Sequence, residues 1–310
     1  MQQNVCPPRS RATSLPRPYT PVVHDVIGET IALRDGRRLG CAEWGDPSGQ
    51  PLMYFHGFPG SRAEGQLGDE AAKTSGVRVI ALDRPGMGLS DFKPGRGFID
   101  WPDDVSEVAE ALGLERFAVL GISGGSPYAA ACAMKFSRRL TGVGIASGIG
   151  PLNAPGATHG MSQQNRLLLQ AVGRFPALSR LFAGAVAVQV KQPDRAIEQV
   201  RRSFAAVDQP YLDRPELRKT LKASFSEAFR NGGRGPAWEM RLYARPWGFR
   251  LEDIEMPVHL WHGEQDANAP IAMGRHLASA IPDCHANFYP REGHLHFVER
   301  LTEILCALRP

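Results

Sequence analysis

The sequence of 310 residues is poor in cysteine and has no long apolar run. Its five cysteines are scattered without a C-x-x-C pair, which argues against a disulfide framework and a thiolate zinc site and indicates reduced thiols. The longest apolar stretch, residues 182–190, has about half of the roughly 18 residues that a membrane-spanning helix needs. The first residues also lack the basic-then-apolar order of a secretory leader. We therefore expect a cytoplasmic protein without a membrane span.

The sequence also lacks dense basic clusters with aromatic residues among them, although its net charge is +4. Residues 1–23 contain three arginines, five prolines and no acid, and we interpret them as a flexible N-terminal tail. An organelle-targeting segment is the alternative, but the prolines disfavour the amphipathic helix that it needs. Residues 153–250 hold 16 basic against 7 acidic residues, spread out as on a solvated face. These features favour a small-molecule substrate over a nucleic acid, for a monomer or a homodimer.

What the chain does contain is a regular alternation of strand and helix patterns. Its apolar (43%) and charged (22%) fractions are ordinary, and its length fits one large domain or a domain with an insertion. Asp35-Gly36 marks a hairpin turn between residues 29–33 and 38–44. Short apolar runs, typical of buried parallel strands, follow at 51–55, 77–82, 117–122, 140–146, 258–262 and 286–289. The alternation predicts an α/β fold with a mostly parallel sheet and helices on both faces.

Strand signals are absent for about a hundred residues after Pro151. Helical patterns replace them near 162–173, 194–206, 215–230 and 236–244. We interpret residues 153–255 as a helical cap or lid, inserted into a core that residues 24–152 and 256–310 form together.

Residues 121–125 read G-I-S-G-G, which matches the pattern G-x-S-x-G between a predicted strand and a predicted helix. Such a sharp turn lifts the serine hydroxyl above the sheet, and glycine suits both of its ends because a side chain there would collide with the turn. The helix N-terminus adds partial positive charge where an oxyanion develops. We interpret Ser123 as a nucleophile; the alternative is a structural turn with an incidental serine.

A second motif, H-G-F-P-G at residues 56–60, directly follows a predicted strand. A loop in that place can aim a backbone N–H at the acyl oxygen, so we expect the oxyanion donors to be the amides of Phe58 and Gly124. A plain His-Gly and Pro-Gly turn is the alternative. The neighbouring residues that we expect to line a substrate pocket are His56, Gly57 and Ile122.

A serine hydroxyl becomes a good nucleophile when an imidazole takes its proton, and a carboxylate must hold that imidazole in the right tautomer. Asp266 and His294 each lie just past the end of one of the last two predicted strands. Open α/β sheets gather their ligands at these ends. We therefore predict a catalytic triad of Ser123, Asp266 and His294.

Each of the two downstream residues has a rival two positions away. Glu264 and His296 share a face of extended chain with Asp266 and His294, so spacing alone does not separate them. We prefer Asp266 because it lies deeper in its turn, and His294 because Gly293 frees its loop. The two histidines also resemble a metal pair, but no third ligand motif accompanies them, so we expect no metal and no other cofactor.

Taken together, these motifs resemble those of the α/β-hydrolase superfamily over residues 24–310. The matching stretches are residues 56–60, 83–91 (D-R-P-G-M-G-L-S-D), 121–125, 261–266 (W-H-G-E-Q-D) and 292–294 (E-G-H). The resemblance implies a sheet of about eight strands with a helical cap inserted after the sixth. Epoxide hydrolases and haloalkane dehalogenases of this superfamily use an aspartate at the elbow, so the serine at position 123 disfavours their chemistry.

The resemblance implies a serine hydrolase of the carboxylic-ester-hydrolase type. We expect it to act on an ester, lactone or related acyl bond of a small hydrophobic substrate through an acyl-enzyme on Ser123. A C–C bond hydrolase, an amidase or peptidase and a non-catalytic binding protein remain alternatives. The cap side chains that either line an acyl pocket or, as we favour, form the cap's own core are Leu168, Leu169, Phe175, Leu181, Phe182, Phe204 and Phe225.

Overall fold

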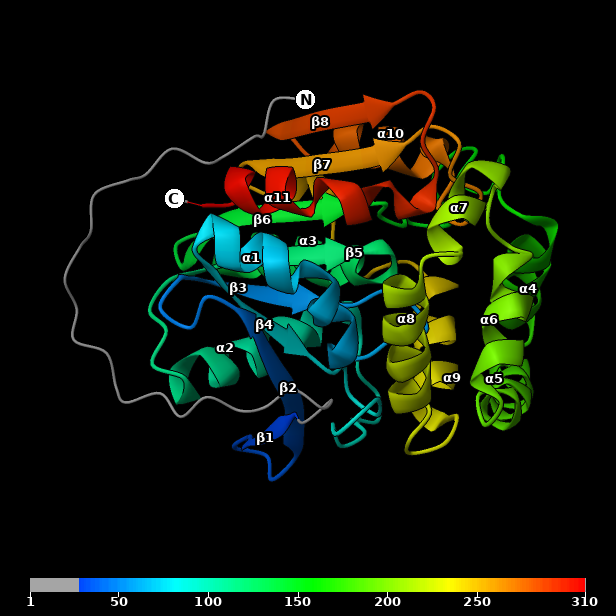
Figure 1. Ribbon diagram of the computed structural model, residues 1–310, viewed down its shortest axis with the longest axis horizontal. Helices are drawn as coiled ribbons and strands as arrows, with labels where there is room; N and C mark the ends of the chain where they lie inside the picture. Colours follow the sequence, from blue (N-terminus) through cyan, green and yellow to red (C-terminus); the bar gives the residue numbers. More distant parts are fainter. Residues whose placement is uncertain (1–27, 310) are drawn as a thin grey trace.

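The computed structural model describes residues 28–309, so the predicted tail at residues 1–23 lies outside the described part of the chain. One eight-stranded sheet has the order β1-β2-β4-β3-β5-β6-β7-β8 (Figure 1). The strands are β1 Glu29–Ala32, β2 Arg38–Gly45, β3 Gln50–Phe55, β4 Val77–Leu82, β5 Phe117–Ile122, β6 Leu140–Ala146, β7 Val258–Gly263 and β8 Cys284–Tyr289. The predicted α/β class is confirmed, and each apolar run identified in the sequence is a strand.

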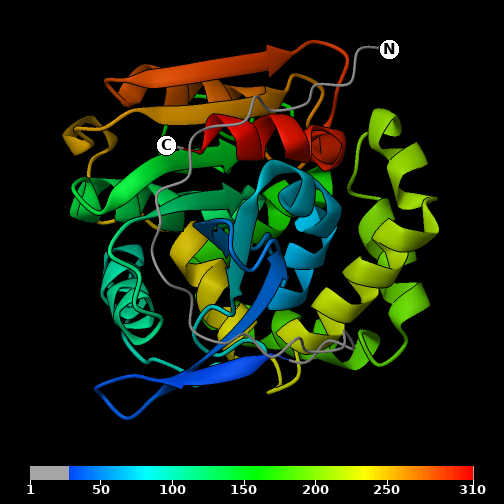
Figure 2. The ribbon, with the colours of Figure 1, turned by 60° about the vertical axis from the view of Figure 1, so that its left-hand side comes forward.

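The sheet is parallel except at one edge. β1 and β2 form an antiparallel hairpin, which reaches out from the body of the molecule in Figure 2, and β2 is also antiparallel to β4. Gly36 in the hairpin turn has φ 84°, a left-handed conformation that glycine adopts without strain. From β4 to β8 all neighbours are parallel. The loops that follow β3, β5, β7 and β8 therefore open at the same edge of the sheet.

Helices cover both faces of this sheet. One face packs against α1 Asp69–Ser75 and α11 Phe297–Ala307, which contact each other across it. The opposite face packs against α2 Trp101–Ala111, α3 Ser126–Phe136 and α10 Ile271–Ala280. Alternate side chains of one strand serve the two cores, with Met53 in one and Leu52 in the other, as the two-residue period of a strand requires.

All helices between β6 and β7 lie at the edge of the sheet toward which the strands point (Figure 1). They are α4 Gln163–Arg174, α5 Leu178–Gln189, α6 Pro193–Arg201, α7 Gln209–Leu212, α8 Pro215–Ala228 and α9 Arg234–Tyr243. The sequence patterns missed α5. Its N-cap residue, Ala177, makes no side-chain capping bond, so the usual start signal of a helix is absent there.

Among the four cysteines within residues 28–309, one differs from expectation. Cys41, Cys132 and Cys284 are free thiols, but Cys306 is disulfide-bonded, so the expectation of reduced thiols is wrong for that residue. Between residues 28 and 309, no helix combines the length and the apolar character needed to cross a bilayer.

Candidate active site

Ser123 occupies a tight turn between β5 and α3. Its φ of 51° is a left-handed conformation that residues other than glycine rarely adopt. A Cβ at Gly121 would lie 2.5 Å from the carbonyl oxygen of Gly125, and a Cβ at Gly125 would lie 2.1 Å from that of Phe55. Both distances are far below van der Waals contact. Gly121 is thus required by the turn that holds Ser123, and Gly125 by the close approach of this turn to the end of β3.

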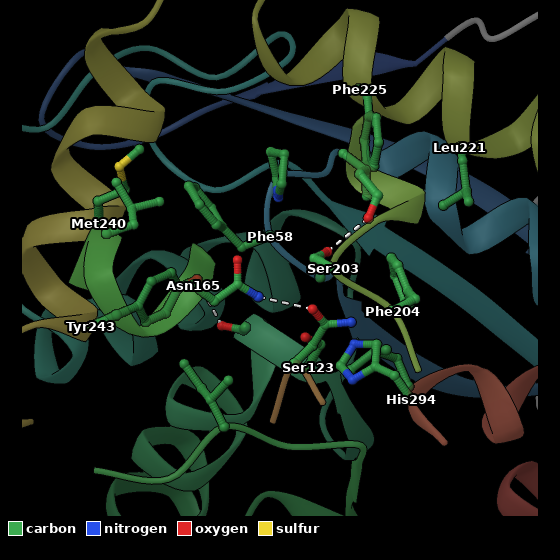
Figure 3. A pocket seen from close by; sticks show the side chains of 18 of the residues that line it. Phe58, Ser123, Asn165, Ser203, Phe204, Leu221, Phe225, Met240, Tyr243 and His294 are labelled. Atoms are coloured by element: carbon green, nitrogen blue, oxygen red, sulfur yellow. Dashed lines mark hydrogen bonds between the residues drawn. The ribbon is translucent and has the colours of Figure 1, made fainter. Parts of the chain in front are cut away.

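Asp266 and His294 meet at the carboxyl ends of β7 and β8. The Nδ1 atom of His294 lies 2.7 Å from Oδ2 of Asp266, and both side chains are buried. The backbone amides of Asn268 and Ala269 donate to the other carboxylate oxygen at 2.8 Å each. The aspartate is therefore fixed by its own loop, and the opposite edge of the imidazole, with Nε2, is available for another partner. Figure 3 shows His294 next to Ser123 on the wall of one cavity.

The two alternative residues, Glu264 and His296, do not take part in this contact. Glu264 lies 3.1 Å from Arg275 in an ion pair. His296 is buried beside the ring of Tyr289, and neither ring nitrogen makes a hydrogen bond within the described residues. Burial lowers the pKa of His296 to about 3, so this imidazole stays neutral. The contact geometry separates the candidates where sequence spacing did not.

A third carboxylate, Asp208, holds the loop that carries His294. The backbone amides of His294 and Leu295 donate to Asp208 at 3.0 and 2.8 Å. A Cβ at Gly293 would lie 2.3 Å from Asp208 Oδ2, so only glycine allows this approach. On the other side, the Ser147 hydroxyl donates to the carbonyl of His294 at 2.6 Å. Asp208 belongs to the helical insertion and lies 86 residues before His294 in the chain. No local sequence pattern indicated its role.

The carboxylates set the charge state of His294. Burial lowers the pKa of His294, but the Asp266 carboxylate outweighs burial, with smaller help from Asp208 and Glu64, and the pKa lies above its ordinary value. Burial raises the pKa of Asp266, but the imidazole of His294 outweighs it and holds this pKa below its usual range. The pair therefore stabilises a protonated imidazole beside an ionised carboxylate.

Phe58 and Gly124 approach each other across the turn. A Cβ at Gly124 would lie 2.8 Å from the Cβ of Phe58, and both residues line the cavity that also contains Ser123. Gly57 lines it too, and its amide donates to a buried carboxylate oxygen of Glu64 at 2.8 Å. The two loops expected to supply oxyanion donors thus meet beside the serine.

His56 and Ile122, also expected in the pocket, have different places. Ile122 lines the cavity, directly before Ser123. His56 is fully buried behind the loop, with Nδ1 2.8 Å from the carbonyl oxygen of Gly57, and does not reach the cavity wall. The expectation for His56 is wrong, because the residue directly follows β3 and its ring is enclosed between the carbonyl of Gly57 and the backbone of Arg84, away from the cavity.

Behind these loops lies a buried ion network that the sequence did not reveal. Arg84 donates to Glu239 Oε2 at 3.0 Å, to the carbonyl of Gly57 at 3.0 Å, and to the carbonyl of His56. Arg96 also contacts the Glu239 carboxylate. Burial raises the pKa of Glu239, but the two guanidinium groups outweigh it and lower this pKa to about 2. The carboxylate is therefore ionised throughout the pH range of a folded protein.

Tyr243, on α9, links this network to the nucleophile turn. Its hydroxyl donates to Glu239 at 2.7 Å and lies 3.0 Å from the carbonyl oxygen of Gly124. Its ring packs edge-on against Phe58 at 5.4 Å. One side chain from the helical insertion therefore supports both residues that we expect to donate to an oxyanion.

The cavity has a volume of about 290 Å³ and lies between the sheet edge and the helical insertion. Most of its wall is apolar. Representative apolar members are Val186, Val190, Leu217, Leu221, Phe225, Phe229 and Met240. Among the described residues that line it there is no lysine or arginine. The wall favours an uncharged, mainly apolar ligand.

The cap side chains named from the sequence fall into two groups. Four of them line the cavity: Leu168, Leu169, Phe204 and Phe225. The other three are exposed, with relative accessibilities of 57% for Phe175, 71% for Leu181 and 38% for Phe182. These three side chains neither line an acyl pocket nor form a core of the cap, so both expectations are wrong for them. Leu181 and Phe182 lie on the exposed side of α5, and Phe175 lies in the turn before it.

Comparison with known proteins agrees with this architecture. A family model described as "alpha/beta hydrolase fold" matches residues 50–301. A non-heme chloroperoxidase from Streptomyces lividans is 26% identical over 78% of this chain and 84% of its own length. A 2-hydroxy-6-oxononadienedioate/2-hydroxy-6-oxononatrienedioate hydrolase from Paraburkholderia phymatum is 27% identical over 79% of this chain and 81% of its own. Among solved structures, a thermophilic esterase from Thermogutta terrifontis has a TM-score of 0.65 at 23% identity, covering 91% of this chain and 96% of its own. The chain belongs to the α/β hydrolase fold family.

Proposed function

We propose that the protein is a serine hydrolase that cleaves an ester, lactone or related acyl bond of a small, mainly apolar substrate. The observation that carries the proposal is the 2.7 Å contact between Asp266 Oδ2 and His294 Nδ1, which fixes the imidazole on the wall of the cavity that contains Ser123. A carboxylate on Nδ1 selects the tautomer whose Nε2 accepts a proton.

In this mechanism the Ser123 hydroxyl oxygen attacks the acyl carbon, and Nε2 of His294 takes its proton. The amides of Phe58 and Gly124 stabilise the negative charge on the acyl oxygen. His294 then gives its proton to the leaving group as the bond to that group breaks. A water molecule, deprotonated by the same imidazole, releases the acid from the acyl-enzyme and regenerates the serine.

The helical insertion, residues 153–255, acts in this proposal as a cap over a core formed by residues 24–152 and 256–310. Its helices supply most of the apolar cavity wall, and its Asp208 fixes the His294 loop. The absence of lysine and arginine from the described lining disfavours anionic substrates, although the insertion as a whole is basic.

The proposal is tested with a fluorophosphonate probe, which labels an activated serine, and with a panel of alkyl esters of increasing acyl length. We expect the probe to label Ser123, and Ser123→Ala to abolish labelling and to lower kcat on the order of 10⁶-fold. Ser203→Ala is a matched control: Ser203 lines the same cavity, but its hydroxyl donates to the carbonyl of Val200 at 2.7 Å. This variant should still be labelled. Two results would refute the assignment: labelling that survives in Ser123→Ala, or equal rates of ester hydrolysis by the wild type and Ser123→Ala.

A further inference from the structure

The outside of the helical insertion carries an unusual number of exposed apolar side chains. Within residues 28–309, every large apolar side chain that is exposed lies between residues 167 and 188 of the chain. The outer face of α4 and α5 consists of these side chains, namely Leu167, Phe175, Leu181, Phe182 and Val188. Single exposed apolar side chains are common, but five in one short segment mark a contact site for another protein or a membrane.

α5 has the composition of a buried helix, but only one of its sides is buried. From residue 181 to its end at Gln189 it contains no charged side chain. Its inner side packs on α9 and contributes Val186 to the cavity wall. Its outer side is exposed, and Figure 1 shows α8 and α9 between the sheet and the layer of α4, α5 and α6. A helix that is apolar on all sides is normally enclosed on all sides, so the outer side of α5 is suited to being covered.

Cations surround the outer face, and acidic residues are missing from its part of the chain. Residues 116–193 contain no aspartate or glutamate. Exposed cations lie on both helices and directly after α5, and none of them has an ion-pair partner within residues 28–309. They are Arg166, Arg174, Arg180 and Lys191. Burial and the positive charges of Arg180 and Arg245 lower the pKa of Arg241, which shows that the positive charge beside α5 is not offset. The outer face therefore favours an anionic partner.

This charge pattern separates the partners that an apolar face can have. A second copy of the chain, bound through the same face about a two-fold axis, would bring cations against cations. Residues 1–23 of the chain itself carry three arginines and no acid, so they are repelled in the same way. An anionic lipid surface complements both parts of the outer face, because apolar side chains enter between the headgroups while lysine and arginine meet the phosphates.

The length of α5 decides how it meets such a surface. Its 12 residues span about 18 Å, whereas the hydrocarbon core of a bilayer is about 30 Å thick. The helix is too short to cross and can only lie in the plane of the interface. Arg180 near its start and Lys191 just past its end place a cation beside each end of the apolar stretch, as this orientation requires.

We propose that the outer face of α4 and α5 binds the surface of a membrane that contains anionic lipids. Leu181 and Val188 enter the headgroup region, and Arg180 and Lys191 contact lipid phosphates. The opposite side of the same two helices lines the cavity, so a bound membrane lies against the helices that cover the site. The inference concerns binding alone and does not depend on the proposed hydrolytic reaction.

The test is co-sedimentation of the full chain with two kinds of vesicle, one of phosphatidylcholine alone and one of an equimolar mixture of phosphatidylcholine and phosphatidylglycerol. We expect binding to the anionic vesicles, several-fold weaker binding to the neutral ones, and a loss of binding as salt is added, because salt screens the attraction. Ser123→Ala should bind as the wild type does, so the result is distinguishable from a failure of the proposed reaction.

Two variants on α5 separate the apolar from the charged contribution, and both change exposed side chains that the fold does not need. Replacing Leu181 and Val188 together by serine should lower the partition coefficient for anionic vesicles at least about tenfold. Arg180→Glu should lower it at least about fivefold, because each cation near an anionic surface contributes about 1 kcal/mol. Arg138→Glu is the matched control and should bind as the wild type does. Arg138 is exposed just before β6, at the edge of the sheet opposite the insertion.

Four results would overturn the inference. They are a wild type that binds neither kind of vesicle, equal binding to both kinds, equal losses in Arg180→Glu and Arg138→Glu, and binding that survives the change of Leu181 and Val188. A wild-type dimer in analytical ultracentrifugation that the same double change converts to a monomer would also overturn it, because the outer face would then belong to a contact between two copies of the chain.

Discussion

Two buried carboxylates flank Ser123, and they have opposite partners. Asp266 contacts an imidazole, whose charge changes between neutral and positive near neutral pH. Glu239 contacts two guanidinium groups, which remain positive at every pH of interest. The pair of Asp266 and an imidazole can take part in proton transfer, whereas the pairing of Glu239 with guanidinium groups can only stabilise the fold. The difference between them shows which buried charges of this molecule are candidates for catalysis.

The same contrast appears in what each carboxylate supports. Asp266 and Asp208 fix one short loop, the one that carries His294. Through Arg84, Glu239 reaches the carbonyl of Gly57, and through Tyr243 it reaches Gly124. We infer that loss of Asp266 affects the reaction more than the fold, and that loss of Glu239 affects the fold more than the reaction.

Among the changes that compare the two carboxylates, Asp266→Asn should have the largest effect. The amide keeps the shape of the side chain but does not stabilise the imidazolium, and it favours the tautomer with a proton on the wrong nitrogen. We expect kcat to fall on the order of 10⁴-fold in the ester assay. The midpoint of urea unfolding should change little. A variant that unfolds as readily as it loses activity would remove the distinction drawn between the two carboxylates.

Glu239→Gln should have its main effect on stability. It leaves Arg84 and Arg96 buried without a counter-charge, and removal of one partner from a buried ion pair costs about 3–5 kcal/mol of unfolding free energy. Urea unfolding followed by tryptophan fluorescence measures this change. Glu252→Gln is the matched control, because Glu252 pairs with Arg250 at the surface and should change stability by less than about 1 kcal/mol. Equal losses in both variants would contradict the structural role of Glu239.

The sequence predicted the features of the site that depend on neighbouring residues. The turn at Ser123 needs only a strand, five residues and a helix, all contiguous in the chain. Asp266 and His294 are predictable because both follow strands that end at the same edge of the sheet. The strands themselves were recognisable because buried parallel strands consist of unbroken apolar runs.

The residues that escaped prediction act over long distances in the chain. Asp208 bonds to a loop 86 residues away, and Glu239 pairs with Arg84 and Arg96 at separations of 155 and 143 residues. No local pattern distinguishes such a carboxylate from a solvated one. The lack of strand patterns indicates the helical insertion, but it does not indicate which faces of its helices pack together. The exposure of Phe175 and Leu181 was therefore not predicted.

The smallest expected effect is a shift in the pH dependence of kcat/KM in Asp208→Asn. It tests whether a carboxylate near His294 acts through its charge or only through its hydrogen bonds. His294 must be neutral to accept a proton, so kcat/KM falls as pH decreases through the raised pKa of His294. The negative charge of Asp208 contributes to that rise, after Asp266. Without this charge the pKa of His294 is lower, and the acid limb of the kcat/KM profile moves to lower pH. Asp213→Asn makes the same change of charge in an exposed pair with Arg201 and should leave the limb in place. An unmoved limb in Asp208→Asn would mean that Asp208 acts only through its bonds to the loop, as Glu239 acts on the other side of Ser123.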